Sequence, residues 1–303
     1  MLDRDTFLTE LYVMVDDFCK ADLAPEMRPG PEASLSRSEV VTLALFGQWA
    51  RFGSERDFYR FAQQRLRGAF PSLPERSQFN RLMRTHHEAI VAFALSLPEM
   101  TDLEAIDLRA ASVRDRRRRG RSWLGGQADY GHSSREGSFF GFHVLLSVGS
   151  EGDITGFCFG PGSAKEQTMA EAFFALRRTP DPRLPSVGRP SRGEYLADKG
   201  FASRLRQVSW KERYGATLLS LVPSKDRYQL PKAWRKQIAS LRQIVETVYD
   251  KLHHSFRLRQ ERPHDVRGFA ARLAAKVGLH NFCLWLNRCL GRKPLAFADL
   301  LGW

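Results

Sequence analysis

Residues 102–256 alternate between strand-like and helix-like segments in an order that few folds can accommodate. Short apolar runs, several of them rich in aromatic and β-branched residues, occupy 103–108, 138–148, 153–159, 194–197 and 217–222. The tetrapeptide GSEG joins the second and third runs as a predicted hairpin. Helical periodicity covers 163–178, 202–215 and 233–256. The order strand, hairpin, helix, strand, helix, strand, helix predicts an α/β layer around a mixed sheet.

This order of elements is that of an RNase H-like core, a mixed sheet flanked by helices. A chain of 303 residues is long enough for about two domains. We therefore expect an all-α, helix-turn-helix-like region over residues 1–100. An RNase H-like domain with basic C-terminal helices is expected over residues 101–303.

Residues 36–97 are predicted to form three helices separated by turns. Ser36 and Glu39 have the spacing of a capping box, Ser54 begins the second helix and Ser77 caps the third. Short helices in succession fit a helix-turn-helix module, whose third helix reads DNA. The side chains that this helix would present to DNA are Arg76, Asn80, Arg81 and Arg84. A plain helical bundle with solvated arginines fits the same pattern, so both interpretations stay open.

The charge of the chain favours a polyanionic partner. The net charge is +13, and residues 200–303 hold 20 Lys and Arg against 7 Asp and Glu. No apolar run approaches the ~18 residues that span a bilayer, and the acidic start does not resemble a secretory signal. Four cysteines without a CxxC pair favour a reducing compartment. We expect a cytoplasmic protein that binds nucleic acid and no membrane.

Three acidic residues are candidates for metal-dependent chemistry. Asp107 and Asp198 stand at the predicted ends of strands, and Glu246 lies in the long helix over 233–256. Three such carboxylates can bind two Mg²⁺ ions through oxygen and leave positions for phosphate and water. The sequence holds no convincing Ser/His/Asp or Cys/His arrangement. A purely structural interpretation of the three residues also stays open, because aspartates at strand ends often form turns or helix caps and a glutamate in a helix is usually a solvated charge.

Helical phase separates Glu246 from Asp250, the next carboxylate along the same helix. The apolar residues of this helix cluster on one face, which we expect to pack on the sheet: Ile238, Leu241, Ile244, Val245, Val248 and Leu252. Asp250 falls nearly opposite that face, whereas Glu246 falls at its border beside Arg242. Glu246 is therefore the candidate metal ligand.

Several segments resemble DDE transposases of small bacterial insertion sequences, most of all the insertion sequence 982 group. Residues 35–84 are similar to the N-terminal region of that group. The segments IDLRAASV, YGHSSREGSFFGFHVLLSVGSEGDITGF, YLADKGF and RQIVETVYDKL match its catalytic domain in order. The chain departs from the group at Leu108, His143, Leu145, Ala239, His253 and Glu166. At the last of these positions an aspartate is usual.

The resemblance implies an RNase H-like fold whose metal-binding triad falls on Asp107, Asp198 and Glu246. It also implies two Mg²⁺ ions, which Mn²⁺ can replace, and a dimer or larger assembly that holds two DNA ends. The expected activity is binding of the element's terminal inverted repeats, hydrolytic cleavage to a 3′-OH, and joining of that end to target DNA. The bacterial cytoplasm is the expected location, on the nucleoid when DNA is bound.

Other basic residues are expected to contact DNA phosphates, which position a protein rather than specify a sequence. These are Arg116, Arg117, Arg118, Arg119, Lys199, Arg242 and Lys251. The arginine run fits a solvated loop equally well. Two other functions stay open: a catalytically silent or host-adopted DNA-binding protein, and an RNase H-like nuclease acting on RNA or hybrids. A helix-turn-helix module favours duplex DNA, because the A-form major groove is too narrow for a helix.

Overall fold

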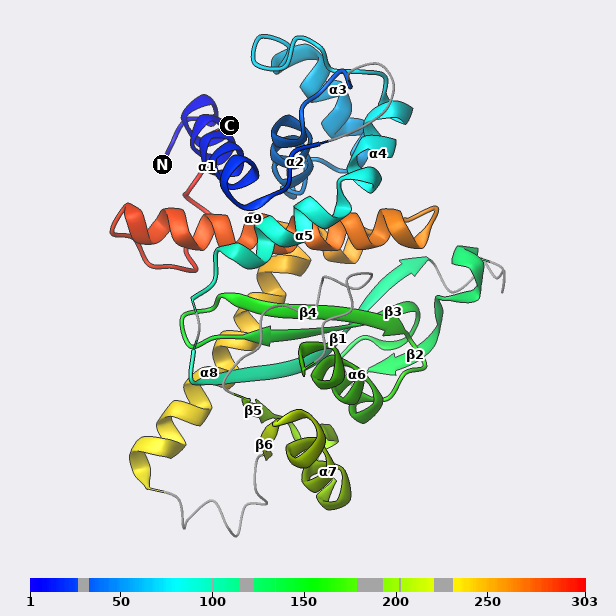
Figure 1. Ribbon diagram of the computed structural model, residues 1–303, viewed down its shortest axis with the longest axis vertical. Coiled ribbons are helices and arrows are strands. Elements are labelled where there is room, and N and C mark those ends of the chain that lie inside the picture. The colour runs from blue at the N-terminus through cyan, green and yellow to red at the C-terminus, as the bar shows by residue number, and fades with distance from the viewer. Residues whose placement is uncertain are drawn as a thin grey trace. The chain divides into compact units, whose positions relative to one another are not determined.

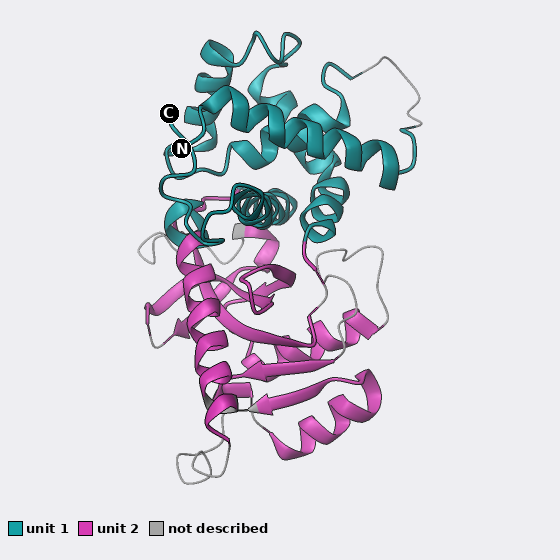
Figure 2. Ribbon diagram, turned by 90° about the vertical axis from the view of Figure 1, so that its left-hand side faces the viewer, with its two compact units in different colours: residues 1–97, 252–258, 264–303 teal, residues 98–251, 259–263 magenta. Residues whose placement is uncertain are grey.

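The computed structural model describes residues 1–26, 33–99, 101–114, 123–133, 135–178, 193–201, 203–220 and 231–303. The chain divides into two compact units, shown in different colours in Figure 2. The helical unit contains Met1–Leu97, Leu252–Leu258 and His264–Trp303, and the α/β unit contains Pro98–Lys251 and Arg259–Pro263. Among the helices that the structure describes, none is long and apolar enough to cross a membrane.

The helical unit differs from the sequence-based division at residue 100 because it includes the C-terminal helix. This helix, α9 (Val266–Cys289), packs against α5 (His87–Ser96) and α2 (Arg37–Phe46). Nearly every residue of α9 from Gly268 to Asn287 is buried, so the helix needs cover on all sides. The N-terminal helices supply that cover. The remaining helices of this unit are α1 (Arg4–Asp22), α3 (Glu55–Arg65) and α4 (Arg76–Thr85).

The starts of two helices follow the sequence signals closely. Ser36 and Glu39 form the predicted capping box of α2, and Ser54 accepts a hydrogen bond from the backbone N–H of Asp57 at the start of α3. The prediction that Ser77 caps the third helix is wrong. Helix α4 begins at Arg76 without a side-chain cap, and the predicted continuous helix is two helices that meet at His86.

The α/β unit is built on a six-stranded mixed sheet (Figure 1). Its strands are β1 (Leu103–Arg114), β2 (Asp129–Ser133), β3 (Gly137–Val148), β4 (Ile154–Pro161), β5 (Glu194–Ala197) and β6 (Thr217–Ser220). Strand β1 pairs with β3 antiparallel and with β5 parallel, and β6 extends the parallel side. Strand β3 pairs antiparallel with both β4 and β2. Every predicted strand is present, and β2 is an additional one.

Helices cover both faces of this sheet (Figures 1 and 2). Helices α6 (Glu166–Arg178) and α7 (Arg204–Tyr214) share a core with the sheet that includes Phe173, Phe174, Tyr195 and Trp210. Helix α8 (Lys232–Asp250) packs against β1. Because alternate residues of a strand point to opposite faces, Ile106 faces α6 whereas Asp107 and Arg109 face α8.

Candidate active site

Asp107 lies in the middle of β1, and not at the end of a strand as predicted, because β1 continues to Arg114. Its Oδ1 accepts a hydrogen bond from the backbone N–H of Leu108 at 2.8 Å, and its Oδ2 accepts one from Nε of Arg109 at 2.9 Å. Burial raises the pKa of the Asp107 carboxyl, and the negative charge of Asp198 adds to this effect, while Arg109 opposes it. Asp107 therefore lies close enough to Asp198 for the two carboxyl groups to interact electrostatically.

Asp198 directly follows β5, as predicted, at the start of the turn formed by Lys199–Phe201. The residue is exposed, and its Oδ1 accepts a hydrogen bond from the backbone N–H of Lys199 at 2.8 Å. A guanidinium nitrogen of Arg242 on α8 lies 3.8 Å from the same oxygen. Since β5 is the parallel neighbour of β1, the sheet itself brings Asp198 towards Asp107.

Glu246 occupies the border of the buried face of α8, where helical phase places it. Leu241, Val245 and Val248 are buried, whereas the Glu246 side chain is 46% exposed and Asp250 is exposed. The Oε1 atom of Glu246 lies 2.6 Å from a guanidinium nitrogen of Arg135 and 4.0 Å from one of Arg109. Arg109 therefore bridges Asp107 on β1 and Glu246 on α8.

Tyr249 fixes α8 against the strand that carries Asp107. Its buried hydroxyl lies 2.7 Å from the carbonyl oxygen of Asp107 and 3.0 Å from that of Val144, and accepts a hydrogen bond from the N–H of Leu146 at 3.1 Å. The Arg109 guanidinium lies over the Tyr249 ring, 5.4 Å from its centroid. These contacts set the register between Asp107 and Glu246.

Glu166, the first residue of α6, is a fourth carboxylate near the two aspartates. Burial raises its pKa, and the charges of Asp107 and Asp198 raise it further. Its carboxylate packs so closely on the turn after Asp198 that a Cβ atom on Gly200 would overlap Oε2. Among the described residues, Glu166 has no hydrogen-bond or ion-pair partner. Glu166 stands where the insertion-sequence pattern usually has an aspartate, and its place near Asp107 and Asp198 is not among the features that the sequence predicts.

The site thus combines four carboxylates with three guanidinium groups, from Arg109, Arg135 and Arg242. Of these three arginines, Arg242 is the one that the sequence predicts to contact DNA. Within the described ranges, no three His, Cys, Asp or Glu side chains are gathered closely enough to hold a metal ion. A guanidinium group contacts each member of the predicted triad.

The chemistry of the donor set nevertheless fits a hard divalent cation. All four acidic side chains offer oxygen ligands of the kind that Mg²⁺ and Mn²⁺ prefer. Two of them, Asp107 and Glu166, have raised pKa values because burial and neighbouring anions disfavour their charged forms. A bound cation would stabilise the charged forms of both carboxyl groups.

The other residues predicted to bind DNA lie on α4, beside Asp198 and at the end of α8. Asn80, Arg81 and Arg84 lie on α4 in the helical unit, where Arg81 is exposed and bonds to Gln78. Arg84 pairs with Asp265, which caps α9, at 3.4 Å. Lys199 is exposed beside Asp198, and Lys251 is half-buried at the end of α8. The run Arg116 to Arg119 lies outside the described residues.

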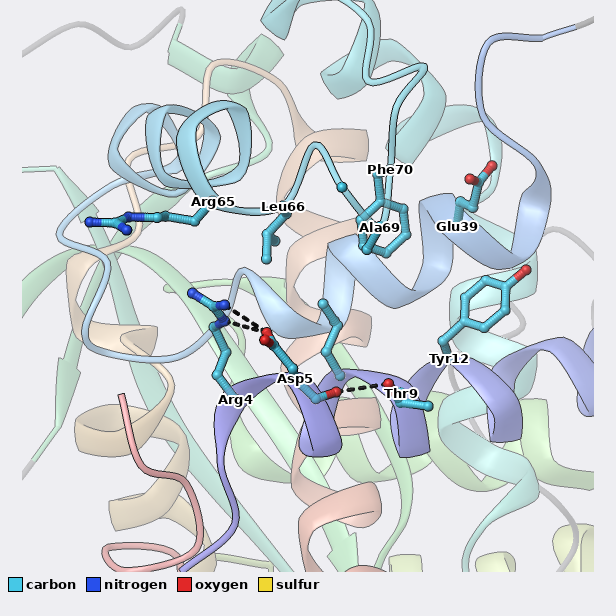
Figure 3. A pocket seen from close by; sticks show the side chains of 11 residues that line it. Arg4, Asp5, Thr9, Tyr12, Glu39, Arg65, Leu66, Ala69 and Phe70 are labelled. Carbon is cyan, nitrogen blue, oxygen red and sulfur yellow. Dashed lines mark hydrogen bonds and ion pairs between the residues drawn. The ribbon is translucent and has the colours of Figure 1, made fainter.

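The helical unit also contains a cavity of about 520 Å³ (Figure 3). It lies between α1 and the segment that follows α3, and Arg4 and Asp5 pair at its edge at 2.7 Å. Its apolar lining comes from Leu8, Leu66, Ala69 and Phe70. None of the predicted site residues lines this cavity.

Comparison with models of protein families, with curated proteins and with solved structures gave no match.

Proposed function

We propose that this protein is a DNA transposase of the DDE type, similar to those of the insertion sequence 982 group. The observation that carries this proposal is the placement of three acids from separate segments: Asp107 and Asp198 follow paired residues of neighbouring strands, and Arg109 contacts both Asp107 and Glu246. Asp107 comes from the central strand, Asp198 from its parallel neighbour and Glu246 from the helix packed on β1.

The strand order supports an RNase H-like assignment for the α/β unit. An antiparallel group, β4–β3–β1, continues on the other side of β1 into the parallel strands β5 and β6. The sequence pattern predicts a mixed sheet for such a core, and β2 adds a strand at the edge of β3. In that fold the acidic residues of β1, of the end of β5 and of α8 belong to one site.

The four carboxylates are the proposed metal-binding groups. Mg²⁺ held there would supply Lewis-acid chemistry to the attacking and leaving oxygens of a phosphodiester. The residues of the chain itself have other roles. Tyr249 fixes the spacing between β1 and α8, and the arginines bind and orient phosphate. Water attacks in the cleavage step and the DNA 3′-OH attacks in the joining step.

Helix α4 is the proposed reader of DNA in a helix-turn-helix-like arrangement of the helical unit. Its polar face carries the exposed Arg81 and the half-buried Asn80. Arg84 is a weaker candidate than the sequence suggests, because Asp265 already holds its guanidinium. The proposed partners are the terminal inverted repeats and target DNA, bound by a dimer or larger assembly in the bacterial cytoplasm.

The test is strand cleavage of DNA that includes the sequences flanking the reading frame. Purified protein should release a defined 3′-OH end with Mg²⁺ or Mn²⁺ and none with EDTA. Asp107→Asn and Asp198→Asn should each abolish cleavage while a band shift on the same DNA persists. Cleavage of an RNA–DNA hybrid but not of duplex DNA would instead identify a nuclease of the same fold. DNA binding without cleavage under all conditions would identify a silent DNA-binding protein.

A further inference from the structure

Arg135 reaches the candidate active site from a turn between two strands. It lies between β2 and β3, where the backbone N–H of Glu136 donates a hydrogen bond to Oγ of Ser133 at 3.0 Å. Its guanidinium contacts Oε1 of Glu246 at 2.6 Å, although the two residues are 111 positions apart in the sequence. Both side chains are about half exposed, at 50% and 46%.

Arg109 contacts the same carboxylate but is held much more firmly. Its side chain is 16% exposed, pairs with Asp107 at 2.9 Å and lies over the Tyr249 ring. Arg135, in contrast, has Glu246 as its single ion-pair partner among the described residues. Arg135 can therefore leave Glu246 without breaking another contact of this kind.

A guanidinium group and a divalent cation compete for the same carboxylate oxygen. Binding of a metal ion through Oε1 of Glu246 would displace Arg135 and leave a half-exposed cation beside the site. Guanidinium groups bind phosphate through paired hydrogen bonds, so a displaced Arg135 suits a DNA backbone phosphate. The exchange keeps both charges paired: Glu246 with the metal and Arg135 with DNA.

We propose that Arg135 is an internal counter-ion of Glu246 that transfers to a DNA phosphate when metal binds, so that metal and DNA bind cooperatively. This inference rests on the proposed function, because it assumes that DNA and a divalent cation share this site. Thermodynamic linkage makes the effect reciprocal: metal raises DNA affinity by the same factor by which DNA raises metal affinity. An exposed ion pair is worth up to about 1 kcal/mol, which sets the expected factor at about fivefold.

The first experiment releases Arg135 without metal. Glu246→Gln should tighten binding of a short fluorescent duplex from the flanking sequence by about fivefold in EDTA. Glu171→Gln on α6 is the matched control. It removes one negative charge and releases two arginines of α7, Arg206 at 2.9 Å and Arg213 at 3.8 Å, as Glu246→Gln releases Arg135 and Arg109. Equal tightening by both variants would overturn the proposal, because net charge alone would then explain it.

The second experiment measures the coupling itself by fluorescence anisotropy at constant ionic strength. Ca²⁺, which occupies oxygen sites without supporting cleavage, should increase the DNA affinity of the wild-type protein by about fivefold. Arg135→Ala should lose this increase, Arg135→Lys should retain part of it, and Arg206→Ala should retain all of it. Arg135→Ala should also raise the Ca²⁺ affinity of the DNA-free protein, measured by thermal shift.

The outcomes separate the inference from the proposed function. A wild-type protein that binds DNA equally well with and without Ca²⁺ contradicts the coupling, as does full coupling in Arg135→Ala. A wild-type protein that binds no DNA under either condition contradicts the proposed function as well.

Discussion

The hydroxyl group of Tyr249 lies 2.7 Å from the carbonyl oxygen of Asp107. A side chain of α8 thereby contacts the backbone of the residue whose carboxylate is the first member of the candidate triad. Glu246 lies on the preceding turn of the same helix, so this contact fixes the distance between two of the acids. Substitution of Tyr249 consequently tests whether the register of α8 matters for activity.

We expect Tyr249→Phe to lower both stability and cleavage. Removal of the hydroxyl leaves the buried N–H of Leu146 without this partner, which costs about 1–3 kcal/mol of unfolding free energy. A small displacement of Glu246 relative to Asp107 should reduce cleavage by about 10- to 100-fold. Urea denaturation and single-turnover cleavage measure the two effects. Unchanged cleavage in a destabilised but folded variant would show that the contact is purely structural.

Glu246 and Asp250 form a natural pair for testing the third ligand. Glu246→Gln should eliminate cleavage while DNA binding persists, because Glu246 lies beside Arg109 and Arg135. Asp250→Asn should retain cleavage within about twofold, since Asp250 is exposed and surface substitutions are worth about 0.5 kcal/mol. Cleavage assays on equal amounts of folded protein decide which of the two residues is the third ligand. Loss of cleavage in Asp250→Asn alone would show that the role had been assigned to the wrong turn of α8.

Glu166→Gln should stabilise the metal-free protein at neutral pH. The pKa of Glu166 is raised above its ordinary value of 4.5 by burial and by Asp107 and Asp198, so its ionised form disfavours the folded state. This cost is fully present above the raised pKa and disappears as the pH falls towards 4.5 and below. The melting temperature of the variant should therefore exceed that of the wild type at pH 7 and equal it in acid.

The same variant tests whether Glu166 contributes to metal binding. Mg²⁺ should raise the melting temperature of the wild-type protein more than that of Glu166→Gln, because metal binding relieves the repulsion in the wild type. The Glu171→Gln variant, altered on the same helix, provides the control. An equal Mg²⁺ effect in the wild type and in Glu166→Gln would exclude Glu166 from the metal site.

Replacement of Asn80 and Arg81 together by alanine should lower the preference for flanking DNA over random DNA. Both lie on the polar face of α4, and base contacts carry sequence preference. Arg84→Ala should change the preference little and stability by no more than about 1 kcal/mol, because Arg84 pairs with Asp265 at the surface. Competition band shifts measure the preference. Equal losses on both DNAs would make α4 a phosphate-binding helix.

The sequence was a good guide to elements with a strong local pattern. The aromatic run of β3, the capping box at Ser36 and the phase of α8 all appear as predicted, because apolar periodicity and capping act within a few residues. Strand β2 was missed because DYGHS is polar and is a strand only through its pairing with β3. The break at His86 has no Gly or Pro to signal it.

The candidate site was predictable only in part. Asp198 and Glu246 follow from a strand end and a helical phase, both local signals. Glu166, Arg109 and Arg135 acquire their significance from neighbours far away in the sequence, and a glutamate at the start of a helix is ordinary in itself. The C-terminal helix was assigned to the α/β domain because sequence order does not show which unit buries α9.

The most direct test of the central claim compares the wild-type protein with Asp198→Asn on DNA that spans the reading frame and its flanks. Asp198 is exposed and directly follows β5, so its replacement by asparagine should leave the fold intact. The account predicts that wild-type protein and Mg²⁺ produce a 3′-OH at a defined position outside the reading frame, and that Asp198→Asn binds this DNA without cutting it. Equal cleavage by both proteins, or cleavage that persists in EDTA, would contradict it.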